Sequence, residues 1–137
     1  MPSRSKTAKI PLNIRSSKNV IVLDVLFHGK RDSRFLKMVL DTGASVTTIP
    51  AEIALSIGCD PSRPKERVEM ITASGIEYVP VVVVPKIKLL GFELVNTEVA
   101  CLELPPRSLV SGLLGLNVLS KFDILLAFLK KYATLTK

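Results

Sequence analysis

Alternating apolar and polar residues predict that most of this chain is β-strand. Residues 20–27 (VIVLDVLF) place large apolar side chains on one face, and the turn-forming stretch HGKRDS follows them. Residues 35–40 (FLKMVL) resume the apolar pattern, so we expect the two segments to pair as a hairpin.

More strand pairs are expected further along the chain. Residues 67–84 (RVEMITASGIEYVPVVVV) form β-branched arms around a tip of small residues, Ala73-Ser74-Gly75, which suits a hairpin that projects and moves. Residues 86–104 predict a hairpin that turns at Leu90-Gly91-Phe92, and KFDILLAF and YATLTK flank a polar turn at Lys130-Lys131. Several short strands with regular turns predict a mostly β fold, built as a closed or nearly closed barrel.

Only two segments predict helix. Pro50 precedes AEIALSIG, a run of good helix formers that ends at Gly58, where a left-handed cap is expected. A shorter helix is expected in GLNVLSKF, from Gly115 onward. Both would be short helices on a β body.

The composition is that of one folded domain. The chain has 137 residues, of which 47% are hydrophobic and 23% are charged, and these values exclude intrinsic disorder. An apolar content this high fits strands that are buried on both faces, or an apolar surface between subunits. Residues 18–137 are therefore expected to form the domain.

The net charge of +7 is concentrated at the N-terminus. Five basic residues and no acid fall within residues 1–19, whereas the rest of the chain carries 14 basic and 12 acidic residues. We therefore expect residues 1–17 to be a basic, flexible extension. An arm that binds nucleic acid or an acidic membrane is the alternative.

Targeting and redox signals are weak. No apolar run approaches the length of a membrane helix and no secretory signal is evident, so no membrane segment is expected. The expected location is the cytoplasm, unless the chain is a fragment of a longer membrane protein. Cys59 and Cys101 lack metal-ligand spacing, so free thiols are expected, with one disulfide as the alternative, and neither a metal nor a cofactor is expected.

One carboxylate stands at the end of an apolar strand. Asp41 ends such a strand within residues 38–50 (MVLDTGASVTTIP), and a carboxylate there costs desolvation energy unless it is hydrogen-bonded, paired or functional. Gly43 allows a tight turn whose amides point back at the carboxylate, and Thr42 adds a hydroxyl. The loop continues with the small residues Ala44 and Ser45. This segment can hold an acid, although Asp-Thr-Gly is also ordinary turn chemistry.

A second motif follows the projecting hairpin. Leu113-Leu114-Gly115, with Asn117 two positions on, ends an apolar strand at a glycine and opens a short helix. With the order acid loop, projecting hairpin and apolar-apolar-glycine, residues 18–137 resemble the retropepsin-like aspartic proteases, the single-domain relatives of the retroviral protease. Asp-Thr-Gly-Ala-Ser at 41–45 matches their catalytic motif, and Leu-Leu-Gly-x-Asn at 113–117 matches the motif that passes behind the catalytic loop.

The resemblance implies a closed acid-protease-type β-barrel with one or two short helices and a flap hairpin, whose tip is Ala73-Ser74-Gly75. It implies an aspartic endopeptidase, in which two carboxylates share one proton and activate a water. The chain has one Asp-Thr-Gly, so a second Asp41 must come from another copy, and a homodimer that acts on polypeptide is expected. In that dimer Thr42 would hydrogen-bond across the two-fold axis, and Gly43 would present its amide to the dyad.

The sequence departs from the retroviral pattern in three places. The flap tip has one glycine, Leu116 stands where an arginine is common, and the N-terminal extension is longer. The terminal strand YATLTK and residues 10–14 (IPLNI) could pair across a subunit boundary, or each could close its own barrel. Substrate pockets are expected to be apolar, with these candidates, each of which also fits plain core: Val46, Ile71, Ile76, Val82 and Leu113.

Two other functions stay open. The chain could be a catalytically silent member of the fold, a dimeric module that binds peptides or acts as a scaffold. A small β-barrel that binds nucleic acid would account for the basic excess, but only 5% of the residues are aromatic and none interleave with basic residues, so no nucleic acid is expected. His28 is expected to be exposed in a turn, without a catalytic triad.

Overall fold

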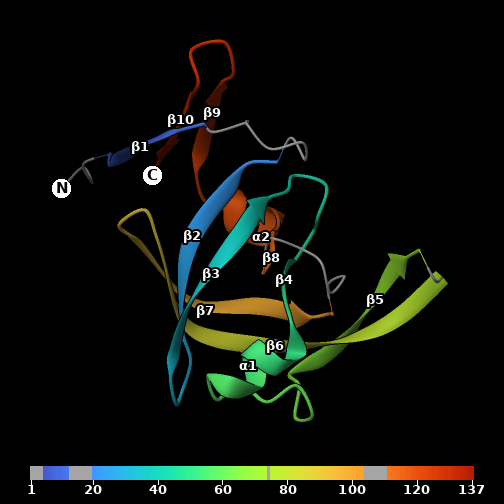
Figure 1. Ribbon diagram of the computed structural model, residues 1–137. Helices are drawn as coiled ribbons and strands as arrows, with labels where there is room; N and C mark the ends of the chain where they lie inside the picture. The colour runs from blue at the N-terminus through green and yellow to red at the C-terminus, as the bar shows by residue number, and fades with distance from the viewer. Residues whose placement is uncertain (1–4, 13–19, 74, 104–110) are drawn as a thin grey trace.

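The fold is described from a computed structural model, in residues 5–12, 20–73, 75–103 and 111–137. These residues form strands and two short helices (Figure 1). In chain order the elements are β1 (Thr7–Pro11), β2 (Val22–His28), β3 (Ser33–Leu40), β4 (Thr47–Ile49), α1 (Ala51–Ser56), β5 (Glu66–Thr72), β6 (Gly75–Leu89), β7 (Phe92–Cys101), β8 (Gly112–Leu114), α2 (Leu116–Leu119), β9 (Asp123–Ala127) and β10 (Tyr132–Thr136).

Six strands close into a barrel. They follow the order β2-β3-β8-β4-β7-β6, and β6 pairs with β2 to complete the ring. The β3–β8 and β4–β7 pairs are parallel, and the other pairs in the ring are antiparallel. Apolar side chains from several strands, among them Phe27, Met38 and Ile87, are fully buried in the common core. The predicted mostly β, closed barrel with two short helices is confirmed.

The two hairpins that the sequence predicts share one long strand. Strand β6 runs without interruption from Gly75 to Leu89, so that it pairs with β5 at its start and with β7 along its later part. Leu90 and Gly91 form the turn to β7 with φ of 51° and 81°, the left-handed pair that suits a two-residue hairpin loop. The β5–β6 end extends away from the barrel in Figure 1.

A separate three-stranded sheet joins the two ends of the described chain. Its order is β1-β10-β9, and all its pairs are antiparallel. One face carries Ala8, Ile10 and Leu135, which pack against the barrel core. The strands at the two ends of the chain therefore pair with each other within one subunit, rather than across a boundary as one alternative had it.

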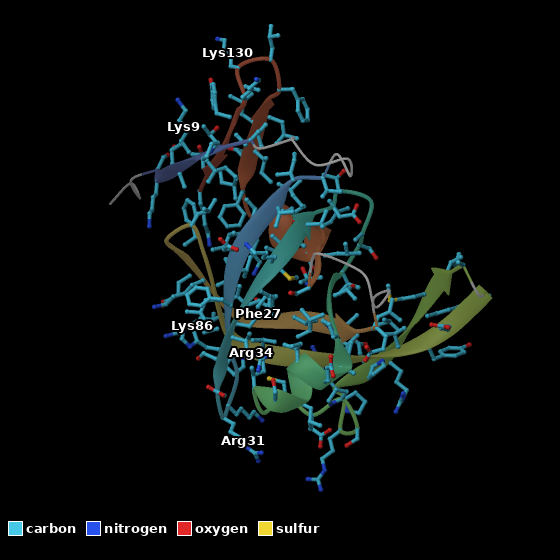
Figure 2. All side chains as sticks on the ribbon, in the orientation of Figure 1. Lys9, Phe27, Arg31, Arg34, Lys86 and Lys130 are labelled. Atoms are coloured by element: carbon cyan, nitrogen blue, oxygen red, sulfur yellow. The ribbon has the colours of Figure 1, made fainter. Side chains whose placement is uncertain are left out.

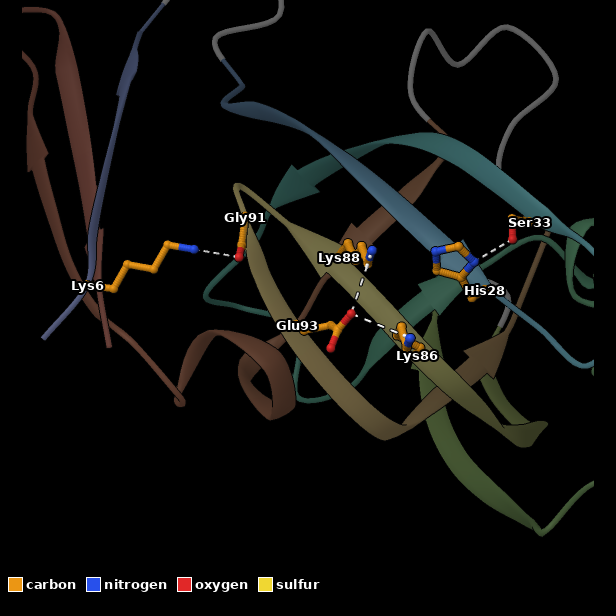
Figure 3. Close-up of polar contacts among 7 residues, drawn as sticks. All are labelled: Lys6, His28, Ser33, Lys86, Lys88, Gly91 and Glu93. Atoms are coloured by element: carbon orange, nitrogen blue, oxygen red, sulfur yellow. Dashed lines mark hydrogen bonds and ion pairs between the residues drawn. The ribbon is translucent and has the colours of Figure 1, made fainter. Parts of the chain in front are cut away.

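The N-terminal segment differs in part from the flexible extension that the sequence predicts. Thr7–Pro11 form β1, because apolar and polar residues alternate there and the apolar ones reach the core. Lys6 adds a backbone pair with Lys137 at 2.9 Å in each direction, and its Nζ donates to the carbonyl oxygen of Gly91 at 2.6 Å (Figure 3). Residues 1–4 and 13–17 of the predicted extension lie outside the described residues, and the domain boundary stays a prediction.

The prediction that His28 is exposed in a turn is wrong. The residue is half-buried rather than exposed, because β2 continues through it and pairs it with Ser33 of β3 and Lys86 of β6. Its Nδ1 lies 2.5 Å from the hydroxyl oxygen of Ser33 (Figure 3).

Cys59 and Cys101 are buried free thiols, as predicted.

Candidate active site

The loop after β3 holds the predicted catalytic acid at the rim of the barrel. Asp41 directly follows β3, and its backbone N–H donates to the carbonyl oxygen of Leu114 at 3.1 Å. Its half-buried side chain accepts a hydrogen bond from the Gly43 N–H at 2.9 Å, and the Ala44 N–H donates to the Asp41 carbonyl oxygen at 3.2 Å. The tight turn therefore points a backbone amide at the carboxylate, as the sequence predicts.

The hydroxyl side chains of the turn are exposed to solvent. A Cβ at position 43 would lie 3.2 Å from Oδ1 of Asp41, so a side chain there would crowd the carboxylate. Thr42 and Ser45 are exposed, and neither side chain hydrogen-bonds to another described residue. The second carboxylate oxygen of Asp41 also has no hydrogen bond within the described part of the chain. The loop thus presents an acid and a free threonine hydroxyl on the same surface.

The apolar-apolar-glycine motif lies directly behind this loop. Leu113 in β8 pairs with Val39 of β3 and Thr48 of β4, so the strand is inserted between the two strands that carry the loop. A Cβ at Gly115 would lie 2.5 Å from the carbonyl carbon of Val46, a contact that real Cβ atoms do not make. Only glycine fits there. The next amide, that of Leu116, donates to the Ala44 carbonyl oxygen at 2.8 Å and ties the motif to the loop.

Asn117 and Thr47 form a polar latch that fixes the two segments together. Oδ1 of Asn117 accepts hydrogen bonds from the Thr47 N–H at 2.8 Å and from the Thr47 hydroxyl at 2.9 Å. The Asn117 amide nitrogen donates to the carbonyl oxygen of Glu98 in β7 at 2.8 Å. The same Thr47 hydroxyl accepts from the Gly115 N–H at 3.1 Å, so three segments are bound at one buried point.

The sequence prediction included Asn117 but missed Thr47. The available signal was a pair of threonines inside an otherwise apolar stretch before Pro50, because a buried hydroxyl needs a partner. Without a structure, the partner could not be identified among the polar residues of the chain.

The β5–β6 hairpin occupies the place of the predicted flap. Its arms pair from Glu66↔Val81 to Thr72↔Gly75. Gly75 has φ of +114°, and Ala73 is exposed, whereas Ser74 lies outside the described residues. The hairpin is therefore present where it was predicted, and the roles of its tip residues stay predictions.

The two faces of the hairpin differ in burial. Val68 and Met70 pack against a small buried cluster of Val79, Val81 and Ala100, and Val46, the residue just after the acid loop, packs against the same cluster. The opposite face leaves Ile71 87% exposed and Ile76 62% exposed. Val82 is only 4% exposed and belongs to the barrel core.

One family model and one crystal structure agree with this architecture. Residues 24–121 match the family model described as "gag-polyprotein putative aspartyl protease". The crystal structure of a retropepsin-like aspartic protease from Rickettsia conorii superposes with a TM-score of 0.71 at 20% identity, covering 99% of this chain and 96% of that one. The solution structure of the Simian Foamy Virus (mac) protease has a TM-score of 0.47 at 22% identity, over 69% of this chain and 87% of that one. No curated protein matches the chain.

The described residues contain no helix long and apolar enough to cross a membrane. Among the same residues, no three acidic, histidine or cysteine side chains gather to hold a metal ion.

The family model covers well over half of the chain, and it includes both the acid loop and the motif behind it. The chain belongs to the retropepsin-like aspartyl protease family.

Proposed function

We propose that the protein is an aspartic endopeptidase whose active site forms only in a homodimer, with one Asp41 from each copy. The observation that carries this proposal is the geometry of the acid loop. Asp41 is held by the Gly43 amide at the rim of the barrel, and one carboxylate oxygen is left without a hydrogen bond to any described residue. A carboxylate fixed in this way can face its symmetry mate.

The chemistry follows from bringing two carboxylates together. Two like charges at hydrogen-bonding distance cannot both ionise, so the pair keeps one proton, as is general for aspartic-protease dyads. The ionised oxygen takes a proton from a water, which attacks the scissile carbonyl carbon, while the protonated oxygen donates a hydrogen bond to the carbonyl oxygen. The tetrahedral species then collapses, and the dyad's proton passes to the leaving amine. The exposed Thr42 hydroxyl would hydrogen-bond across the axis.

The terminal sheet supports self-association. Strand β9 pairs with β10 on one edge, and its other edge pairs with no strand among the described residues. An open edge with a 53% exposed leucine, Leu125, at its centre is suited to antiparallel addition of the same strand from a second copy. Such a contact would join two three-stranded sheets around a two-fold axis.

The substrate would be an extended polypeptide. The β5–β6 hairpin is a projecting strand pair (Figure 1), and its Met70 packs on the same buried cluster as Val46, which follows the acid loop. A peptide held between the hairpin and the loop can form main-chain hydrogen bonds as an added strand. The apolar residues Val46 and Met70 favour apolar side chains beside the scissile bond.

The proposed location is the cytoplasm, and this proposal rests on the sequence alone.

Replacing Asp41 with asparagine tests the proposal. D41N keeps the size of the side chain but cannot ionise, so hydrolysis of an apolar peptide or a denatured protein should vanish while the protein still self-associates. D24N is the matched control, because Asp24 is an exposed carboxylate whose contact is a surface ion pair with Lys37 at 3.3 Å. D24N should cleave like the wild type.

Two results would count against the proposal. Hydrolysis that survives in purified D41N would remove Asp41 from the chemistry. A wild-type protein that dimerises but cleaves nothing between about pH 4 and 7, where a shared-proton dyad works, would favour the silent peptide-binding module.

A further inference from the structure

The β9–β10 hairpin ends in an unusual turn. Residues 128–131 (FLKK) close it, with the Lys131 N–H donating to the Phe128 carbonyl oxygen at 3.1 Å. Turn centres favour glycine, proline, asparagine, aspartate and serine, whereas Leu129 stands here and is 95% exposed. Phe128 beside it is 54% exposed. Nothing in the turn geometry requires two large apolar side chains in water.

Three lysines lie at the same end of the molecule as these apolar side chains. Lys130 and Lys131 lie in the turn, and Lys9 of β1 lies at the same end of the molecule, with its ammonium 4.3 Å from the Tyr132 ring centroid (Figure 2). None of the three lysines has an ion pair with a described residue. The one acid in the three strands, Asp123, is at the far end of β9.

A hollow lies beside the turn. It has a volume of about 410 Å³ and is lined by Lys9, Ile10, Pro11, Lys130, Lys131 and Tyr132. Its lining therefore combines three lysines that form no ion pair with a described residue, a tyrosine, and the apolar side chains of Ile10 and Pro11. A hollow of this kind fits an anionic headgroup, while the neighbouring Phe128 and Leu129 fit an apolar phase.

We propose that this hairpin tip, residues 128–131 together with Lys9, docks the protein on an anionic lipid membrane. Phe128 and Leu129 insert at the boundary between headgroups and acyl chains, and the lysines contact the lipid phosphates. The long lysine side chains can reach the phosphates while their methylene groups stay among apolar atoms. The proposal does not depend on the proteolytic function.

Charge and shape favour a membrane over a second copy of the chain. A two-fold contact of the tip with itself would bring Lys130 and Lys131 against their own copies, with no acid at the tip to offset them. The tip also projects from the molecule as a turn, away from the barrel (Figure 1). A projecting apolar turn can enter a lipid surface, and β9 remains available along its edge for a partner subunit.

Co-sedimentation of the full chain with vesicles tests the proposal. Vesicles of phosphatidylcholine mixed with phosphatidylglycerol should bind the protein, and vesicles of phosphatidylcholine alone should not. Each lysine near an anionic surface contributes about fivefold in affinity, so K130Q/K131Q should bind roughly 20- to 30-fold more weakly. F128S/L129S should lose at least about tenfold, because two large apolar side chains no longer leave water.

Matched control variants separate the tip from general charge and apolarity. K86Q/K88Q removes the same charge from β6 of the barrel, and L55S/V95S removes two exposed apolar side chains far from the tip in sequence. Both controls should bind anionic vesicles within about twofold of the wild type, because the tip itself is intact.

Sedimentation velocity of the same variants distinguishes a membrane from a second subunit. The proposal expects both tip variants to self-associate like the wild type. It is overturned if the wild type ignores anionic vesicles, if the tip variants bind them no more weakly than the control variants, or if the tip variants lose self-association. Loss of self-association would indicate that the tip contacts a partner subunit instead of a membrane.

Discussion

Removing the Asn117 side chain should weaken the whole acid-loop region. In N117A, the Thr47 N–H, the Thr47 hydroxyl and the Glu98 carbonyl oxygen lose bonds of 2.8, 2.9 and 2.8 Å. A typical hydrogen bond contributes about 0.5–1.5 kcal/mol net, and a buried group left unpaired costs about 1–3 kcal/mol. Since the site is partly buried, we expect N117A to lower the free energy of unfolding by about 2–4 kcal/mol.

The assay is urea unfolding at one fixed protomer concentration, because the proposed self-association would also stabilise the fold. T47V is the matched variant, since it removes only the hydroxyl and keeps the backbone N–H bond to Asn117. It should cost about 1–2 kcal/mol, and the double variant should cost less than the sum, because both changes remove the same Thr47–Asn117 contact. A loss below about 0.5 kcal/mol in N117A, or full additivity, would refute the latch.

Three other outcomes follow from the structure. G115A should destabilise the protein strongly, because its Cβ would lie 2.5 Å from the Val46 carbonyl carbon; an expressed variant that melts like the wild type would contradict this. For the proposed dimer and activity, L125D should shift the protein toward monomer and lower hydrolysis in parallel, since two carboxylates would meet at the β9 edge; an unchanged sedimentation profile would place the interface elsewhere. Burial, with Cys59 nearby, raises the pKa of the Cys101 thiol from 9.0 to about 11, so native Cys101 should resist iodoacetamide near pH 8 and react once unfolded. Because the unfolded thiol loses its proton first, this contribution to stability should be lost as pH rises from about 9 to 11, and rapid labelling of the native protein would contradict the reasoning.

Local patterns predict the strands well, because burial of one face of a pleated sheet makes apolar residues recur at every second position. The hairpin tips at residues 73–75 and 90–91 were found from small residues and glycine, which permit left-handed backbone. The acid loop was found from the tight turn that Gly43 allows, and Gly115 from the apolar strand that ends at it; the structure places the two motifs in contact. Both motifs could therefore be identified before any tertiary information.

Pairing between segments that are distant in sequence determined the features of the fold that the sequence could not predict. The predicted break near residues 85–86 does not exist, because β7 and β2 both pair with β6 and keep it continuous. Thr7–Pro11 form a strand because β10 offers an open edge, and charge alone suggested a mobile end. Thr47 is part of the latch only because Asn117, distant in sequence, meets it in space.

Subunit mixing tests the central claim, that each chain carries half of a catalytic site, most directly. Wild-type and D41N protein would be mixed in varying ratios at constant total concentration, re-equilibrated, and assayed for peptide hydrolysis. If the site needs an Asp41 from both copies, only wild-type dimers cleave, so activity follows the square of the wild-type fraction and an equal mixture retains about one quarter. Activity that instead falls linearly, with about one half left in the equal mixture, would contradict a site shared between subunits.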